Sequence, residues 1–292
     1  MNIHLIDGTY ELFRHYFAVP KVENAVGLEV GALRGVVHSL LGMLEDGATH
    51  MAVATDHVVE SFRNDMWDGY KDGSGIEPEL LAQFHPFEDA LRAVGIVVWP
   101  MVEYEADDAL AAGAAMALAD TRVEQVLICT PDKDLAQCVV ADRVVQFDRR
   151  KRLVIDRAGV VEKFGVEPES IPDYLALVGD SADGFPGLPG WGAKSAGVVL
   201  GRYGYLEEIP AAVEDWDVTV RGAARLAATL RDQMDDALLF RRLATLDVKA
   251  PVSAGVDELK WSGPAEGWRE VLEGLGLESV VSRVERRLNI ES

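Results

Sequence analysis

Positive charge is scarce in this chain. Its 292 residues include 28 Lys and Arg against 49 Asp and Glu, which gives a formal net charge of −21. This balance argues against a protein that coats nucleic acid with a broad basic surface, because affinity for phosphates comes mainly from Lys and Arg. Most of the acidic excess is expected to be a solvated surface that favours solubility. Part of it, however, lies at positions that a solvated surface does not explain.

Cysteines are also few, and long apolar runs are absent. Cys129 and Cys138 are the only two cysteines, which excludes a secreted scaffold held together by disulfides. No apolar run approaches the roughly 18 residues that a membrane span needs. The first residues lack the basic start of a signal peptide. We therefore expect a cytoplasmic protein that does not associate with membranes.

Short apolar runs alternate with segments of helical spacing in the first half of the chain. The predicted strands are residues 3–6, 51–55, 95–99 and 125–129, followed by a hairpin of 144–147 and 153–155. The predicted helices are residues 31–46, 77–94 and 106–118. Strands that alternate with helices indicate an α/β fold with a central, mostly parallel sheet flanked by helices.

No strand is predicted beyond residue 159. The rest of the chain is expected to be helical, including residues 194–203 and 223–246. We therefore predict an α/β domain over residues 1–168 and a helical region over residues 169–292. The polar, glycine-containing stretch of residues 60–75 is expected to be mobile.

Three of the predicted strands end at an aspartate. These residues are Asp7, Asp56 and Asp132. In open α/β sheets, functional groups gather at the carboxyl ends of the strands. A single aspartate at such a place is usually a turn residue or a helix cap. Three in the same topological position are harder to explain in that way.

Further acidic residues accompany these three. Glu105 and Asp108 are three residues apart at a predicted helix start, so they share one face, although acids in a first turn also complement the helix dipole. The DxD motif Asp132-Lys133-Asp134 and the tight turn between Asp180 and Asp183 supply the others. The full set is Asp7, Asp56, Glu105, Asp107, Asp108, Asp132, Asp134, Asp180 and Asp183.

Nine carboxylates that face one cleft would require compensation. Two like charges about 4 Å apart repel by roughly 4 kcal/mol at an effective dielectric constant of about 20. Raised pKa values or bound cations relieve this repulsion. Ligands that are all oxygen favour Mg²⁺ or Mn²⁺ over Zn²⁺, and two such ions about 3.5–4 Å apart are suited to phosphodiester cleavage.

A glycine-rich connection leads into one of the predicted helices. Gly190 and Gly192 allow the backbone to approach a partner closely. Backbone N–H groups at the start of the following helix suit a phosphate, and Lys194 and Ser195 add a charge and a hydroxyl. An ordinary glycine-rich loop is the alternative. Next to the acidic motifs, the pattern favours binding to a phosphate backbone.

Together these motifs resemble the 5′→3′ exonuclease / flap endonuclease family, of the kind that forms the N-terminal nuclease domain of bacterial DNA polymerase I. The resemblance covers about residues 2–250 and implies the PIN/FEN-like form of the α/β fold. No polymerase domain follows, so a free-standing form is expected. The matching motifs are Ile6-Asp7-Gly8, Ala54-Thr55-Asp56, Ser61-Phe62-Arg63 with Gly69-Tyr70-Lys71, Tyr104–Asp108, Thr130–Leu135 and Gly179–Ala196.

The resemblance implies a role for each motif. Asp7, Asp56, Glu105, Asp107 and Asp108 would form a first metal site, and Asp132, Asp134, Asp180 and Asp183 a second. Lys71 and Arg14 match basic positions that hold the substrate phosphates near the metals. Residues around 60–90 match a flexible arch, and Gly190–Ala196 matches a helix–turn–helix element that grips duplex DNA with a bound K⁺. The expected DNA contacts are Arg63, Tyr70, Lys133, Gly190, Gly192, Lys194 and Ser195.

The chain departs from the family pattern at three places. Gly184 stands where the family commonly has Asn, and Ser74 where it commonly has Arg. The loss of that Arg puts rate enhancement by the arch in doubt but leaves the acidic set intact. Trp191 stands where a smaller aliphatic residue is usual. It is expected to be packed, with a wedge against DNA as the alternative.

The predicted function is metal-dependent hydrolysis of DNA at 5′ flaps, junctions and 5′ ends, with RNA primers as a further substrate that the sequence leaves open. The resemblance implies products with a 5′-phosphate and a 3′-hydroxyl. The partners are DNA and RNA–DNA hybrids, and the family expectation is a monomer. Three alternatives stay open: a junction-binding relative with weak or lost catalysis, an RNA-directed nuclease of the related small toxin class, and a Mg²⁺ phosphatase for small molecules.

Overall fold

The chain divides into two compact units, and each is interrupted along the sequence. The computed structural model describes the backbone of residues 1–291 and the side chains of residues 1–288. Unit 1 consists of Met1–Ser61, Gly73–Thr130 and Asp247–Ser292, and unit 2 of Phe62–Asp72 and Pro131–Leu246. The division into two domains at residue 168 stays a prediction.

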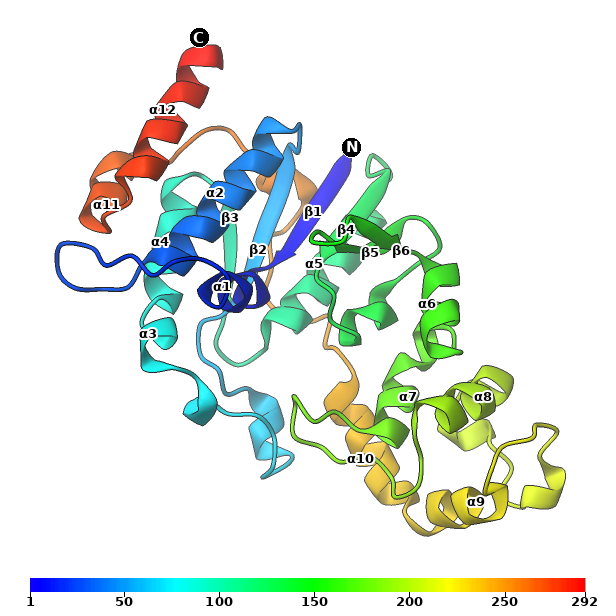
Figure 1. The fold of residues 1–292 in the computed structure, drawn as a ribbon. Coiled ribbons are helices and arrows are strands. Elements are labelled where there is room, and N and C mark those ends of the chain that lie inside the picture. The colour runs from blue at the N-terminus through cyan, green and yellow to red at the C-terminus, as the bar shows by residue number, and fades with distance from the viewer. Residues whose placement is uncertain (292) are drawn as a thin grey trace. The chain divides into compact units, whose positions relative to one another are not determined.

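Four parallel strands form the centre of unit 1. They are β1 (Asn2–Asp7), β2 (His50–Asp56), β3 (Val97–Met101) and β4 (Gln125–Cys129). Their order is β3-β2-β1-β4 (Figure 1). The strands are apolar on both faces, as buried parallel strands are. The strands predicted from short apolar runs are thus confirmed, and β3 begins two residues later than expected.

Helices flank this sheet. The helices of unit 1 are α1 (Gly8–Tyr16), α2 (Gly31–Glu45), α3 (Pro78–Leu81), α4 (Phe84–Ala93), α5 (Ala106–Ala119), α11 (Trp268–Gly274) and α12 (Glu278–Glu291). Helix α5 packs against all four strands, while α1 and α4 pack on β2 and on α2. The predicted helix of residues 77–94 is two helices, because Pro86 lacks an N–H and belongs in the first turn of a new one.

Unit 2 is mostly helical. A hairpin of β5 (Val144–Asp148) and β6 (Leu153–Ile155) is antiparallel, as predicted. The helices are α6 (Arg157–Phe164), α7 (Ile171–Val178), α8 (Ala193–Tyr203), α9 (Ala223–Asp232) and α10 (Met234–Ala244). Helix α7 packs against both α8 and α10. The predicted helix of residues 223–246 is broken at Gln233, whose φ of −125° and ψ of 31° leave the helical region.

None of the described helices is both long enough and apolar enough to cross a bilayer.

Candidate functional site

Asp7 is held at the carboxyl edge of the sheet in unit 1. It ends β1, and its Oδ1 accepts a hydrogen bond from the N–H of Tyr10 at 2.8 Å, which caps α1. Its Oδ2 accepts from the hydroxyl of Thr130 at 2.9 Å, immediately after β4. The carboxylate is therefore fixed between the ends of two neighbouring strands, as the strand-end pattern predicts.

Asp56 ends β2 and lies at the same edge. Its backbone N–H donates to the hydroxyl of Thr9 at 2.9 Å. Its Oδ1 accepts from the N–H of Ala106, the first residue of α5, at 2.8 Å. Asp56 thus links the end of β2 to the start of α5, where the next acidic residues lie.

The first turn of α5 carries Glu105, Asp107 and Asp108. The N–H of Glu105 donates to Oδ2 of Asp108 at 3.0 Å, and the Ser61 hydroxyl donates to Oε1 of Glu105 at 2.7 Å. Oδ1 of Asp108 accepts from the N–H of Asp247 at 2.8 Å. Asp108 is fully buried and both its oxygens accept backbone hydrogen bonds, so this side chain holds the start of α5 in place. Asp107 is half-buried on the same turn.

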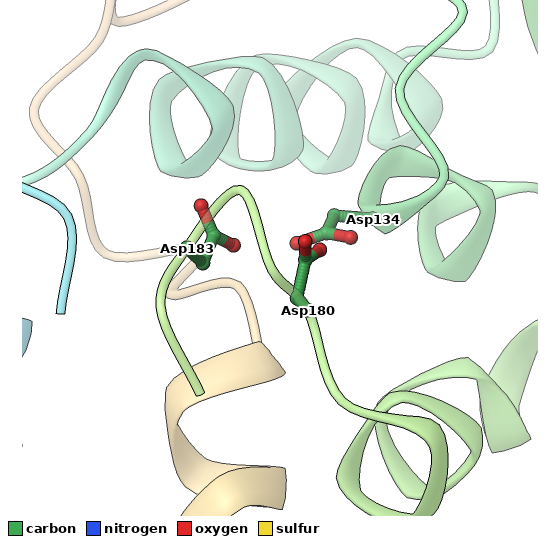
Figure 2. Close-up of side chains that lie close together, drawn as sticks. All are labelled: Asp134, Asp180 and Asp183. Atoms are coloured by element: carbon green, nitrogen blue, oxygen red, sulfur yellow. The ribbon is translucent and has the colours of Figure 1, made fainter. Parts of the chain in front are cut away.

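A second group of carboxylates lies in unit 2. Asp134 begins the short helix Asp134–Cys138, while Asp180 and Asp183 come from the loop after α7. One oxygen from each carboxylate lies within 4.8 Å of the others (Figure 2). Oδ1 of Asp180 accepts from the N–H of Ala182 at 2.9 Å, which tightens the loop. Three of the four acids predicted for the second metal site therefore converge within unit 2, and we call these three residues the aspartate cluster.

The aspartate cluster is short of positive charge. Burial raises the pKa of Asp134 well above its usual range, and the neighbouring Asp132, Asp183 and Asp180 raise it further. Among the residues that the structure describes, Oδ1 of Asp134 has no hydrogen-bond partner. Lys133 offsets part of the charge through an ion pair with Asp180, at 2.5 Å. An oxygen-lined site with a buried and unpartnered carboxylate oxygen suits a hard cation.

Asp132 lies next to the cluster in the DxD motif. Its Oδ1 accepts from the N–H of Asp134 at 3.0 Å. Its backbone carbonyl accepts from the side-chain amide of the fully buried Gln146 at 2.5 Å. The hairpin that contains Gln146 thus supports the backbone from which Asp132 and Asp134 extend.

Lys71 is anchored to the aspartate cluster from the segment of residues 62–72. Its ammonium lies 2.9 Å from Oδ1 of Asp183, and its backbone N–H donates to the carbonyl of Asp183 at 3.0 Å. The Asn64 side chain donates to the carbonyl of Lys71 at 3.0 Å. Side chain and backbone together therefore hold the basic group that the sequence predicts beside these acids.

Gly184 allows this segment to approach the cluster. Its φ is +85°, and a Cβ atom there would lie 2.0 Å from the carbonyl oxygen of Gly69. The indole N–H of Trp67 donates to the carbonyl of Gly184 at 3.1 Å. The departure from the family's Asn thus accompanies a close backbone contact that leaves no room for a side chain.

Besides Lys71 and Lys133, three more of the basic and aromatic residues predicted to contact DNA or its phosphates are held by contacts within the protein. Arg63 is 1% exposed and donates to the backbone carbonyls of Leu243 and Thr245 at 2.8 and 3.0 Å. Tyr70 is buried in the core of unit 2. Arg14 pairs with the buried Glu11 in α1. Because Arg63 and Tyr70 expose almost no surface, we do not carry them into the proposed DNA contacts.

The glycine-rich connection leads into α8 as predicted. Gly190 is exposed with a φ of +89°. Gly192 precedes α8, and its N–H donates to the Ser195 hydroxyl at 3.1 Å, which caps the helix start. The Lys194 side chain is exposed at this helix start. Trp191 is buried against Trp216, with ring centroids 6.3 Å apart, so it is packed rather than exposed as a wedge.

The sequence reasoning did not single out the hydroxyl and amide groups that orient these acids. Thr130 and Ser61 fix Asp7 and Glu105, while Asn64 fixes the backbone of Lys71. Thr130 and Ser61 lie inside motifs used for the resemblance, whereas Asn64 lies between two of them. The motifs were the available signal for Thr130 and Ser61, but each is far along the chain from the acid that it contacts, so the sequence does not reveal the pairing.

Family models match almost the whole chain. A model described as "5′-3′ exonuclease, N-terminal resolvase-like domain" matches residues 2–165, and a second, "5′-3′ exonuclease, C-terminal SAM fold", matches residues 166–267. The chain belongs to the 5′-3′ exonuclease family. The resemblance read from the acidic and glycine-rich motifs is thereby confirmed.

Relatives of this 5′-3′ exonuclease family member include longer and similar-sized proteins. DNA polymerase I of Bacillus caldotenax is 33% identical over 289 residues, which are 96% of this chain and 32% of that protein. The chain spans about a third of the length of such polymerases. A 5′-3′ exonuclease of Aquifex aeolicus is 29% identical over 288 residues, which are 98% of this chain and 96% of that protein.

Solved structures share the fold of the 5′-3′ exonuclease chain. The T5 5′-exonuclease, whose structure contains bound divalent zinc ions, matches with a TM-score of 0.66 at 19% identity and covers 97% of this chain and 100% of its own. The catalytic core of Rad2 in complex with DNA matches with a TM-score of 0.61 at 13% identity. The match covers 96% of this chain and 91% of the Rad2 chain. These likenesses confirm the α/β fold with a helical C-terminal part, while the helix–turn–helix detail stays a prediction.

Proposed function

We propose that this protein hydrolyses phosphodiester bonds of DNA at 5′ ends, 5′ flaps and junctions between single and double strands, using divalent metal ions. The aspartate cluster carries the proposal, because three carboxylates within 4.8 Å of one another need a cation to stay ionised together. Membership of the 5′-3′ exonuclease family supports the choice of substrate.

The residues present fit divalent cations. In unit 2, Asp134, Asp180 and Asp183, with Asp132 beside them, offer only oxygen ligands, and Oδ1 of Asp134 lacks a partner among the described residues. In unit 1, Asp7, Asp56, Glu105 and Asp107 lie at the carboxyl edge of the sheet, with Asp108 in a supporting role. We assign one ion to each group, Mg²⁺ or Mn²⁺. When bound, such ions lower the pKa of water and polarise a phosphate.

The chain's own residues orient the substrate. The Lys71 N–H donates to the carbonyl of Asp183, and the Asn64 side chain donates to the carbonyl of Lys71. Held in this way, Lys71 offers its ammonium to the scissile phosphate and stabilises the charge that grows there. Arg14 offers a second cation from the last turn of α1. Lys133 keeps Asp180 in place through their ion pair.

Grip on the duplex is proposed to come from the glycine-rich connection and the start of α8. Gly190 and Gly192 bring the backbone close to the sugar–phosphate chain, while Lys194 and the capped start of α8 contribute positive charge. A K⁺ at Gly190–Ala196 would be held by backbone carbonyls. Contacts of this kind select DNA by its structure rather than its sequence.

A cleavage assay on a 5′-labelled flap duplex tests the proposal. We expect cleavage with Mg²⁺ or Mn²⁺ and none with EDTA. Asp134→Asn, which removes a charged ligand without changing its size, is expected to lower the rate at least 100-fold. The control is Asp215→Asn, an exposed acid of unit 2. Cleavage in EDTA, or at the native rate in Asp134→Asn, contradicts the metal mechanism. Flap binding without cleavage by the native chain indicates the non-catalytic alternative.

A matched RNA–DNA hybrid in the same assay tests activity on RNA primers.

We also propose that the protein works as a monomer in the cytoplasm. Sedimentation at increasing protein concentration tests the oligomeric state.

A further inference from the structure

Unit 2 contains a pocket of about 620 Å³ between the end of α6 and the start of α8. Three cationic side chains line it: Lys163, Lys194 and Arg202. None of the described residues that line the pocket is acidic. In a chain with 49 acidic and 28 basic residues, a pocket lined by cations and free of carboxylates is unusual.

Two of the three cations have no carboxylate partner among the described residues. Arg202 pairs with Asp217 at 2.6 Å. Lys194 and Lys163 form no ion pair with the described residues, and the Lys163 ammonium lies 4.7 Å from the ring centroid of Phe164. Both lysines are exposed, so a ligand can reach them. Their charge is available to an anion that comes from outside the chain.

The surroundings of Lys163 disfavour its positive charge. Partial burial lowers the pKa of Lys163, and the nearby Lys151 and Lys133 lower it further, while Asp132 and Asp148 act in the opposite direction. An anion bound beside Lys163 would relieve this cost.

Glycines hold the two lysines in one place. A Cβ atom on Gly197 would lie 2.5 Å from the carbonyl oxygen of Phe164, and one on Gly201 would lie 2.4 Å from that of Gly165. Helix α8 therefore packs directly on the backbone that follows Lys163. This packing sets Lys163 beside the helix start that carries Lys194, where backbone N–H groups also favour an anion.

We infer that the pocket binds a phosphate of the nucleic-acid backbone through Lys163 together with Lys194. The inference rests on the proposed function for the substrate and adds Lys163, at the end of α6, to the duplex-binding surface. A phosphodiester fits better than a base, since the convergent polar groups are cationic side chains. The pocket extends the contact from the start of α8 toward α6.

Salt dependence of DNA binding tests this inference without catalysis. Binding of the flap duplex is measured in EDTA over a series of salt concentrations. The slope of log K against log salt falls by about 0.9 for each phosphate contact that is lost. We expect Lys163→Gln to lower the slope by about that amount and to weaken binding several-fold at low salt, as Lys194→Gln does. Lys163→Arg is expected to keep the native slope.

Two controls separate this effect from a general change of charge or of folding. Lys249→Gln removes one charge from an exposed lysine of unit 1 and is expected to keep the native slope. Thermal unfolding of each variant reports whether it is folded. An unchanged slope in folded Lys163→Gln overturns the inference, and so does an equal loss in Lys249→Gln.

A further arm distinguishes backbone phosphate from free phosphate. Inorganic phosphate is titrated while the NMR signals of the lysine side chains are followed. Binding of inorganic phosphate at Lys163 with no change in the DNA salt slope overturns the assignment to the nucleic-acid backbone. Failure of the proposed function is distinct, because it appears as absent cleavage by the native chain with Mg²⁺ or Mn²⁺.

Discussion

Because Gly184 has no side chain, Lys71 can lie beside the aspartate cluster. Gly184 has a positive φ and touches the carbonyl of Gly69. Lys71 is two residues beyond Gly69 and contacts Asp183, the neighbour of Gly184. The position of the Lys71 ammonium therefore depends on the lack of a side chain at residue 184. A search of the sequence for chemically active side chains overlooks this glycine.

Gly184→Ala tests this dependence. We expect the Cβ atom to displace residues 62–72 from the loop after α7, because the contacted atom is a backbone oxygen that cannot rotate away. The cleavage rate should fall at least ten-fold with a smaller change in KM, and stability should fall by roughly 1–3 kcal/mol. Steady-state kinetics and urea unfolding measure both quantities.

The matched control for this substitution is Gly255→Ala. Gly255 has an extended backbone and nothing near its Cβ position. The Gly255→Ala variant should keep the native cleavage rate. A native rate in Gly184→Ala would show that the close contact with Gly69 is not needed to hold Lys71.

At the scale of elements, the sequence predicted the buried strands well and the helix breaks poorly. The strands of residues 3–6 and 125–129 are apolar runs that end at turn residues, so pattern alone identifies them. The break at Gln233 has neither Gly nor Pro within the helix to mark it. The break before α4, in contrast, has Pro86 in the first turn of the new helix, and the side chain of the preceding Gln83 accepts a hydrogen bond from the N–H of Leu33 in α2. The first of these breaks therefore leaves no mark in the sequence pattern, whereas the second does.

The acidic motifs were predictable as candidates because their spacing and strand-end positions are visible in the sequence. Their individual roles were not. Asp108 appears equivalent to Asp107 in sequence, yet its oxygens hold the start of α5. Arg63 appears available for DNA, yet it donates to carbonyls that lie some 180 residues later in the chain. Only the fold reveals such distant partners.

The packing of α12 on α2 supplies a pH-dependent element. Burial lowers the pKa of His38 on α2, and Arg283, Arg34 and Arg286 lower it further, against the opposing Glu45. His38 Nε2 lies 3.0 Å from the Ser279 hydroxyl, and Arg283 donates to the His38 carbonyl at 2.6 Å. A protonated His38 would thus face several arginines.

We expect stability to fall as the pH drops below the unfolded pKa of His38. The pKa of His38 is lower in the folded state than in the unfolded state. Below about pH 6.5, His38 is therefore protonated in the unfolded chain more readily than in the folded chain, which favours unfolding. His38→Gln should remove up to about 1.4 kcal/mol per pH unit from this acid-side slope. Urea unfolding between pH 5.5 and 7.5 measures it, and an identical slope in native protein and variant would contradict the role of His38.

At the scale of the whole molecule, the net charge of −21 makes stability depend on cations. Without metal, the carboxylates of the aspartate cluster repel one another. We expect Asp134→Asn to raise the melting temperature in EDTA by about 2–4 °C for each 1 kcal/mol of repulsion removed. Excess Mg²⁺ should stabilise the native protein by about 2.7 kcal/mol at 100 times its Kd, and the variant by less.

Calorimetry with and without Mg²⁺ measures these shifts. The exposed Asp215→Asn variant should follow the native protein under both conditions. Equal Mg²⁺ stabilisation of native protein and Asp134→Asn would show that the cluster is not the site where the cation acts.

The two units also receive their residues at different times during synthesis. Unit 1 takes its last portion from Asp247 onward, where the N–H of Asp247 bonds Asp108 and Arg283 of α12 pairs with Glu45 of α2. Unit 2 has its whole sequence once residue 246 has been made. On the ribosome, unit 1 therefore becomes complete only after residues from Asp247 onward have been made, while unit 2, which holds the aspartate cluster, can finish folding first.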